Sequence, residues 1–445
     1  MNNWVIRNAE VVDASGVRMA DVLVRDGVIE WIAEAGAGAV MSAKEFDAGG
    51  RSLFPGVIDD QVHFREPGLT HKEDILHATT AAAAGGVTSY MEMPNTVPNT
   101  LTQELLAAKY DLGAANSLVN YSFYMGASND NLEEVLRTDP RTVCGLKAFL
   151  GSSTGNMLVD DPVTLDRLFR KAHLLLAIHA EDEGTVRANM KAATERWGDA
   201  IPMEEHPRIR SAEACFKSSS NAVALAKEHG TRLHVLHIST AKEVELFDAG
   251  PLEEKRITAE ACVHHLWFTD ADYADKGAFI KWNPAVKTAA DRAAIRQGVI
   301  DGRIDVVATD HAPHTMEEKA ANYAQCPSGG PLIQHSLVAM LELQQQGVFT
   351  LEQVVEKLCH APARMFQIAR RGYIREGYKA DMVLVDRNAP WTVEKSNLLY
   401  KCGWSPFEGQ RFGAKVVRTW VNGNCVFADD VVDPTVRGER LLFDR

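Results

Sequence analysis

Eight apolar runs alternate with stretches of helical spacing through the middle of the chain. The runs that we predict as strands are Val57–Phe64, Val87–Met93, Leu118–Tyr124, Gly145–Leu150, Leu174–His179, Arg232–His237, Ile257–Val263 and Ile304–Thr309. Helical spacing between them covers Lys72–Ala84, Thr102–Ala114, Ser211–His229 and Asp291–Ile300. Eight strands alternating with helices predict an α/β fold, a closed parallel (β/α)8 TIM barrel. A doubly wound open sheet is the competitor, but no G-x-G-x-x-G turn follows the first strand.

Both ends of the chain have a different pattern. Residues 4–12, 21–33 and 45–53 are short alternating stretches broken by Asp-Gly and Gly-Gly, which is typical of antiparallel strands. The same pattern returns near the C-terminus in Asp381–Val385, Val416–Val421 and Cys425–Phe427, with a turn at Asn422-Gly423-Asn424. We therefore predict a small β-sandwich domain formed by residues 1–54 and 370–445, beside a barrel of residues 55–369.

Composition narrows the class of protein. The 445 residues suit one large barrel with an accessory domain, and 46% hydrophobic and 24% charged residues are ordinary for a globular enzyme. The net charge of -13 disfavours nucleic acid or an anionic membrane as a partner. No apolar run could span a bilayer, no signal peptide is evident, and the seven scattered cysteines form no C-x-x-C pair. We expect a cytoplasmic enzyme with a small-molecule substrate and reduced thiols, in a homo-oligomer for which a dimer is the default.

Nearly every predicted strand ends in a polar residue that can do chemistry. The residues at these ends are His63, Arg65, Asn95, Lys147, His179, His237, His264, His265, Asp310, His311 and His314. A single histidine at a strand end is more often structural, and a lysine in an apolar run usually extends to solvent. The joint pattern argues for function, because the carboxyl ends of barrel strands converge on one active site. Several nitrogen and oxygen ligands around one open position suit a catalytic zinc.

Lys147 is the most unusual of these residues, because it lies within the apolar run Gly145–Leu150. Burial disfavours an ammonium group, so its pKa falls and the amine becomes neutral and nucleophilic. A neutral amine can take up carbon dioxide and form a carbamate. The carbamate is an anion with two oxygens, which could bridge two metal ions.

Eight ordered motifs resemble the amidohydrolase superfamily and, within it, the dihydroorotases. They are D-D-Q-V-H-F-R-E-P-G, M-E-M-P-N-T-V-P, G-L-K-A-F-L-G-S-S-T-G-N, I-H-A-E-D-E, L-H-I-S-T-A, T-A-E-A-C-V-H-H-L, K-W-N-P-A-V-K and A-T-D-H-A-P-H. The resemblance runs from Phe54 to about Asp386 and returns near Ser405-Pro406-Phe407. H-F-R-E-P-G and M-P-N-T favour dihydroorotases over hydantoinase-like relatives.

The resemblance implies a role for each matching residue of the metal site. His63 and Asp310 look like ligands of one zinc position, and His179 and His237 look like ligands of a second. Lys147 resembles the carboxylated lysine that bridges the two. Asp310 would also take a proton from the attacking water and give it to the departing amide nitrogen.

The resemblance also implies a substrate. Arg65, Asn95 and His314 resemble the residues that bind the substrate's carboxylate and ring, and Asn283 would add a contact. The implied reaction is the reversible cyclisation of N-carbamoyl-L-aspartate to L-dihydroorotate in pyrimidine biosynthesis. The segment Ser328–Pro331 follows the last strand, where its glycine pair suits either a mobile lid or a plain surface turn.

Gln61 departs from the family pattern, which has histidine at this position. A glutamine oxygen binds zinc less well than imidazole does. The first metal position could therefore fill weakly, the enzyme could work with one zinc, or the chain could be a non-catalytic scaffold. A hydantoinase or allantoinase is a further alternative. Arg65 disfavours it, because a neutral hydantoin gives a guanidinium nothing to pair with.

Overall fold

The computed structural model describes residues 3–36, 43–151 and 157–445. All eight predicted barrel strands are present. They are β6 (Val57–Val62), β7 (Val87–Glu92), β8 (Asn120–Phe123), β10 (Leu146–Phe149), β11 (Leu176–His179), β12 (Leu233–Val235), β13 (Ile257–Cys262) and β14 (Val306–Ala308). The end of the G-L-K-A-F-L-G-S-S-T-G-N motif, residues 152–156, lies outside the described residues.

The strands close into a parallel barrel. One parallel sheet has the order β6-β7-β8, and the other has the order β14-β13-β12-β11-β10-β9, where β9 is Met125–Gly126. One residue separates β8 from β9, so the chain itself connects the two sheets at that point. At the other edge, a parallel bridge pairs Val62 at the end of β6 with His311 just after β14. The fold is therefore a TIM barrel, as predicted.

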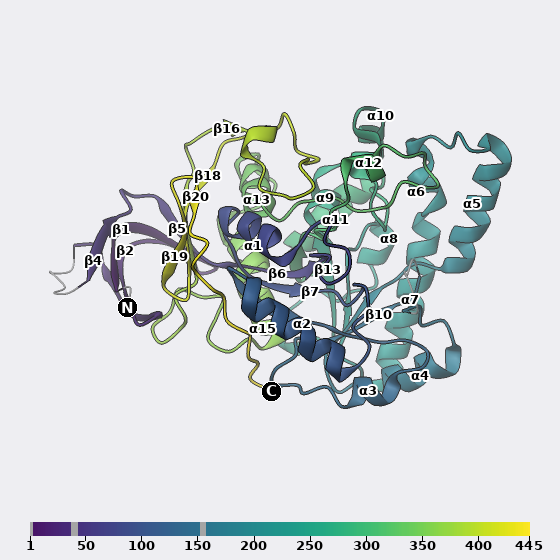
Figure 1. Ribbon diagram of the computed structural model, residues 1–445, viewed down its shortest axis with the longest axis horizontal. Helices are drawn as coiled ribbons and strands as arrows, with labels where there is room; N and C mark the ends of the chain where they lie inside the picture. Colours follow the sequence, from purple (N-terminus) through teal and green to yellow (C-terminus); the bar gives the residue numbers. More distant parts are fainter. Residues whose placement is uncertain (1–2, 37–42, 152–156) are drawn as a thin grey trace.

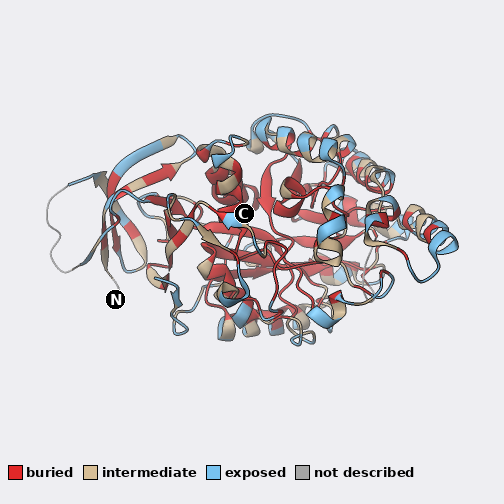
Figure 2. Cartoon of the chain, turned by 90° about the horizontal axis from the view of Figure 1, so that it is seen from above, coloured by how far each residue is buried: buried red, intermediate tan, exposed pale blue. Residues whose placement is uncertain are grey.

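Helices cover the outside of the barrel (Figure 1). The four predicted ones are α1 (Ile75–Ala84), α2 (Gln103–Asn116), α7 (Ala212–His229) and α11 (Ala289–Ile300). The others are α3 (Leu132–Leu136), α4 (Pro162–Lys171), α5 (Glu183–Trp197), α6 (His206–Ile209), α8 (Ala241–Val244), α9 (Val263–Trp267), α10 (Tyr273–Lys276), α12 (Met316–Lys319), α13 (Ser336–Gln345), α14 (Leu351–Val355) and α15 (Ala361–Phe366). Seen from above, buried strands fill the centre, and the outer faces of the helices are exposed (Figure 2).

Capping side chains set where the helices begin. Helix α1 begins three residues later than predicted, because the Asp74 carboxylate accepts a hydrogen bond from the backbone N–H of His77. Helix α11 begins two residues earlier than predicted, because Thr288 and Asp291 form a capping box.

Strands from both chain ends form one nine-stranded sheet beside the barrel (Figure 1). Its strands are β1 (Trp4–Asp13), β2 (Gly16–Arg25), β3 (Val28–Glu34), β4 (Lys44–Asp47), β5 (Ser52–Pro55), β15 (Met382–Asp386), β18 (Lys415–Val421), β19 (Asn424–Ala428) and β20 (Val431–Val432). Strand β5 joins the two ends, since it pairs in parallel with β1 and antiparallel with β15. The predicted stretch 21–33 is a hairpin that turns at Asp26-Gly27. A separate pair, β16 (Trp391–Thr392) and β17 (Arg411–Phe412), lies outside this sheet.

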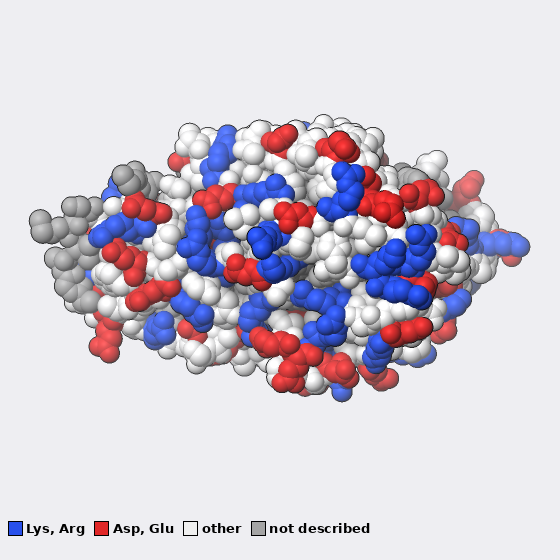
Figure 3. All heavy atoms as spheres, turned by 90° about the horizontal axis from the view of Figure 1, so that it is seen from below, with Lys and Arg blue, Asp and Glu red and all other residues white. Residues whose placement is uncertain are grey.

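Lysine and arginine are interspersed with aspartate and glutamate on the face drawn in Figure 3. None of the helices in residues 3–36, 43–151 and 157–445 combines the length and the apolar character that crossing a bilayer requires.

Candidate active site

One cavity of about 630 Å³ lies at the carboxyl ends of the barrel strands. Every predicted site residue lines it: Gln61, His63, Arg65, Asn95, Lys147, His179, His237, Asn283, Asp310 and His314. The barrel thus brings together residues that lie up to 253 positions apart in the chain, from Gln61 to His314. The particular roles assigned to these residues stay predictions.

Three of these residues have a left-handed backbone. Arg65 has φ 67°, His237 has φ 40° and Asp310 has φ 48°. Residues other than glycine rarely adopt such values, and each costs about 1–3 kcal/mol. The backbone turns sharply just past β6, β12 and β14, which places these side chains on the cavity wall.

His179 and His237 form a pair that suits a metal ion. Nδ1 of His179 lies 3.0 Å from Nε2 of His237, and both rings are buried. The other nitrogen of His179, Nε2, donates to Oε2 of Glu181 at 3.0 Å, and Arg210 contacts the same oxygen at 2.6 Å. Burial lowers the pKa of both histidines, so the rings are neutral. Two neutral imidazole nitrogens that converge on one point, with a carboxylate behind one ring, are ligands of the kind that a catalytic zinc site uses.

Lys147 lines the same cavity as this histidine pair. Its side chain is buried, and burial lowers the pKa of the ammonium to about 7. Nζ lies 4.5 Å from the centre of the Phe149 ring, on the same face of β10. A large fraction of this amine is neutral at physiological pH, so it could either bind a metal or take up carbon dioxide.

The first predicted metal position is built differently. Nε2 of His63 lies 3.2 Å from Oδ1 of Asp310, and Nδ1 of His63 lies 2.8 Å from Oδ1 of Asn95. Nε2 of Gln61 donates to the same Oδ1 of Asp310 at 3.2 Å. Asn95 therefore orients His63, in addition to the substrate contact predicted for it. Gln61 presents an N–H group where a metal site requires a lone pair.

A positive cluster lies at another part of the cavity wall. The Arg65 guanidinium is 7% exposed, and its Nε donates to the carbonyl oxygen of Pro313 at 3.1 Å. Nη2 of Arg65 lies 3.0 Å from Nε2 of His314, and Nζ of Lys72 lies 3.1 Å from Nδ1 of His314. Burial lowers the pKa of His314 to about 3, so this ring is neutral and the charge belongs to Arg65 and Lys72. Glu318, 2.8 Å from Lys72, offsets one of the two charges.

Asn283 and the segment after β14 supply further contacts. Oδ1 of Asn283 is buried and has no hydrogen-bond partner among the described residues. Such an oxygen costs free energy unless a donor reaches it, and a bound N–H group could do so. Ser328 and Gly329 also line the cavity, and Gly329 is pinned by its N–H to Lys281 and by its carbonyl oxygen to Lys319. The glycine pair is buried, so this segment is not a plain surface turn.

Other buried histidines lie outside the predicted ligand set. His264 and His265 follow β13 in helix α9; His264 stacks on Trp282, with ring centres 4.3 Å apart, and His265 contacts the carbonyl oxygen of Pro284 at 3.1 Å. His234 lies 3.3 Å from Asp60, and its other nitrogen contacts Thr258 at 2.8 Å. These contacts agree with the structural role predicted for His234.

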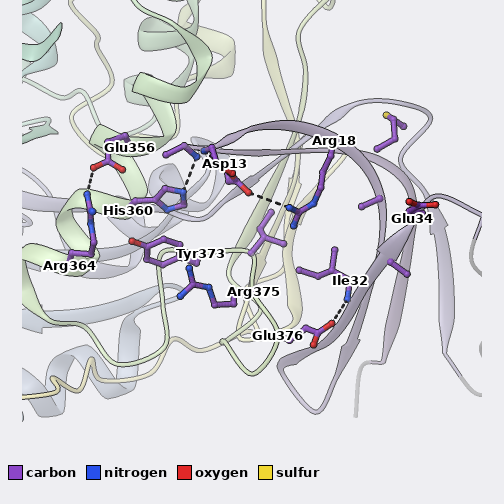
Figure 4. Close-up of a pocket in the computed structure, with 16 residues that line it drawn as sticks. Asp13, Arg18, Ile32, Glu34, Glu356, His360, Arg364, Tyr373, Arg375 and Glu376 are labelled. Carbon is purple, nitrogen blue, oxygen red and sulfur yellow. Dashed lines mark hydrogen bonds and ion pairs between the residues drawn. The ribbon is translucent and has the colours of Figure 1, made fainter. Parts of the chain in front are cut away.

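A second cavity, of about 700 Å³, lies between the β domain and the barrel (Figure 4). Among its charged side chains, Arg364 pairs with Glu356, and Arg18 lies 3.8 Å from Asp13. Of the described residues that line it, no three His, Cys, Asp or Glu side chains lie close enough together to hold a metal ion. The larger cavity is therefore not the candidate active site.

Sequence reasoning missed three residues of the site. Glu181 was visible in I-H-A-E-D, where a carboxylate two residues after a histidine can reach its ring. Lys72 stood at the start of the predicted helix Lys72–Ala84, where a lysine gives no signal of a site residue. Arg210 comes from beyond helix α6 and reaches the site only through the fold.

Comparison with known proteins identifies the family. Residues 52–426 match the model of the amidohydrolase family, and residues 1–48 match that of the urease alpha-subunit N-terminal domain. The chain belongs to the amidohydrolase family. It is 33% identical over 432 residues to a dihydroorotase of Halobacterium salinarum, with 96% of this chain and 97% of the relative covered. It is 32% identical over 434 residues to an allantoinase of Streptomyces avermitilis, with 96% and 95% covered.

A solved structure agrees with this assignment. The L-hydantoinase (dihydropyrimidinase) of Arthrobacter aurescens superimposes with a TM-score of 0.91 at 27% identity, covering 97% of this chain and 98% of that one. Taken together, these matches define a cyclic amidohydrolase of the dihydroorotase, allantoinase and hydantoinase type. They also support the prediction of a hydrolytic enzyme over that of a scaffold.

Proposed function

We propose that this enzyme is a dihydroorotase, which interconverts N-carbamoyl-L-aspartate and L-dihydroorotate. The observation that carries the proposal is the buried guanidinium of Arg65 in the wall of the same cavity as His179 and His237. A buried cation needs an anionic partner, and dihydroorotate brings a carboxylate that a guanidinium can hold with two parallel hydrogen bonds. Hydantoin and allantoin bring no carboxylate.

The metal would be zinc, held by His179, His237 and Lys147. When bound, zinc lowers the pKa of a water ligand to about 7 and polarises an amide carbonyl. Lys147 would act as its carbamate, whose negative charge a cation stabilises. His63 and Asp310 would flank this ion at the neighbouring position, where Gln61 stands in place of the family's histidine.

The remaining residues would position the substrate and move protons. Asp310 would accept a proton from the attacking water and return it to the amide nitrogen that leaves the ring. In the direction of ring closure, the same carboxylate would take the proton from the attacking nitrogen. Asn283 would accept a hydrogen bond from a ring N–H, which would satisfy its buried oxygen. Asn95 and His314 would contact the substrate beside Arg65.

Turnover of three cyclic amides tests the assignment. The purified enzyme, supplied with zinc and bicarbonate, is assayed with dihydroorotate, hydantoin and allantoin. We expect the highest kcat/KM with dihydroorotate, and ring closure of N-carbamoyl-L-aspartate at lower pH. A clear preference for hydantoin or allantoin would overturn the assignment. Absence of turnover with all three substrates would favour the non-catalytic scaffold instead.

A further inference from the structure

The side-chain amide of Gln61 faces Asp310 with its nitrogen. Nε2 of Gln61 lies 3.2 Å from Oδ1 of Asp310, and both side chains are buried. The amide oxygen, Oε1, points the other way and lies 3.7 Å from Sγ of Cys262. His63 follows β6 directly, two residues after Gln61, and its Nε2 lies 3.2 Å from the same carboxylate oxygen.

This arrangement does not suit a metal ion between His63 and Asp310. A ligand must offer a lone pair, and an amide nitrogen has none available. Oδ1 of Asp310 already accepts the Gln61 N–H. To offer Oε1 instead, the amide would have to turn over, which would break its hydrogen bond to a carboxylate and aim two N–H groups at Cys262. The thiol is a weak acceptor that itself donates to Oε1 of Glu260 at 3.2 Å.

The pair His179 and His237 shows the opposite arrangement. Their facing nitrogens lie 3.0 Å apart, and within residues 3–36, 43–151 and 157–445 no hydrogen bond from a side-chain amide reaches either of them. Glu181 holds the far nitrogen of His179, which keeps the near one directed at the cavity. One position has converging lone pairs, and the other is closed by an N–H donor.

We infer that this enzyme takes a single divalent cation, held by His179, His237 and Lys147, and that the Gln61 amide replaces a first cation by hydrogen-bonding Asp310. Asp310 and His63 are then not metal ligands. Gln61 is a positioning residue, because it fixes the carboxylate at the cavity wall without contacting the metal. The inference rests on the metal-dependent hydrolysis proposed above and sharpens it.

Counting metal ions tests this inference without any activity assay. The protein is incubated with excess zinc chloride and bicarbonate, desalted and analysed by inductively coupled plasma mass spectrometry. We expect one zinc per chain in the wild type and in His63→Ala, and none in His237→Ala. We expect two in Gln61→His, and one again in Gln61→His combined with His63→Ala. The double variant is the matched control, because it removes only the imidazole partner of the new ligand.

Several results would overturn the inference. They are two ions or none in the wild type, loss of the ion in His63→Ala, or a well-folded Gln61→His that stays at one ion. If Gln61→His does not fold, a zinc-edge anomalous map of wild-type crystals tests the inference instead. We expect one peak beside His237. A peak between His63 and Asp310 would contradict the inference. Substrate preference does not enter this test. A preference for allantoin would overturn the proposed function and leave the ion count unchanged.

Discussion

The carboxylate of Glu181 accepts a hydrogen bond from Nε2 of His179 at 3.0 Å. This contact fixes the ring so that Nδ1 faces His237 and the cavity. Arg210 holds the carboxylate from behind at 2.6 Å. Burial raises the pKa of Glu181, whereas the Arg210 charge and the hydrogen bond from His179 lower it, and the net effect is a pKa well below the usual range. Glu181 is thus an anion behind the ring that determines which nitrogen of His179 faces the cavity.

Replacing Glu181 by glutamine should weaken metal binding. Glutamine keeps the shape and can still accept the N–H of His179, but it loses the negative charge that makes the ring a better ligand. We expect zinc affinity to fall by about 10- to 100-fold, the usual cost of losing such a partner. Competition with a chromophoric chelator measures the affinity. Glu195→Gln, an exposed position of α5, is the control and should bind zinc normally. Unchanged affinity in Glu181→Gln would contradict the role given to Glu181.

Lys147 should make the stability of the metal-free protein depend on pH. The free energy of unfolding should decrease as the pH falls from about 10.5 to about 7. The pKa of this buried ammonium is about 7 in the folded protein, against 10.5 for a free lysine. Between these values the unfolded chain binds the extra proton and the folded chain does not, so stability falls as the pH drops from about 10.5 to 7. Lys147→Met cannot bind that proton. Relative to the variant, the wild type should gain roughly 2 kcal/mol between pH 7.5 and 9.5.

Urea denaturation of both proteins at the two pH values, with chelator present, checks this expectation. The comparison cancels every other titrating group, because both proteins share them. Parallel stability curves would show that Lys147 stays protonated in the fold. Such a result would also remove the physical basis for a carbamate at this position.

The sequence predicted the barrel well, because long runs of β-branched and apolar residues mark strands that are buried on both faces. The run Val57–Phe64 is an example, and its strand β6 is buried throughout. Helix starts were less predictable, since they depend on caps such as Asp74, whose side chain could equally have served a turn. Within the predicted stretch 21–33, Asp26-Gly27 is the turn between two paired antiparallel strands.

The site residues were predictable because the carboxyl ends of all barrel strands lie at the same face of the barrel. Partners from other parts of the chain were not predictable in this way. The packing around α6 brings Arg210 to Glu181, and no local sequence pattern predicts this contact. The direction of the Gln61 amide was equally invisible, since it depends on Asp310 and Cys262 on either side.

Removing the charge of Arg65 should damage turnover of dihydroorotate selectively. Arg65→Gln keeps a polar side chain in the cavity wall but cannot pair with a carboxylate. A charge-assisted hydrogen bond contributes about 1.5–3 kcal/mol, so we expect kcat/KM for dihydroorotate to fall roughly 10- to 100-fold. Any slow turnover of hydantoin should change much less. Steady-state kinetics with both substrates measures the ratio.

Arg208→Gln is the control for this substitution, because its side chain is 71% exposed. It should leave both rates unchanged. An equal loss on the two substrates in Arg65→Gln would mean that Arg65 supports the cavity and does not recognise the carboxylate. That outcome would remove the main support for dihydroorotate as the substrate.

Asp310→Asn should separate proton transfer from metal binding. Asparagine occupies the same space but cannot accept a proton from water, so we expect kcat to fall by about 10²- to 10⁴-fold, the usual contribution of a general base. The zinc content should stay at one ion per chain, since the ion lies with His179 and His237. Asp301→Asn, an exposed carboxylate after α11, should change neither quantity. Loss of zinc together with activity in Asp310→Asn would show that Asp310 is a ligand after all, and that its carboxylate holds the metal in addition to moving the proton.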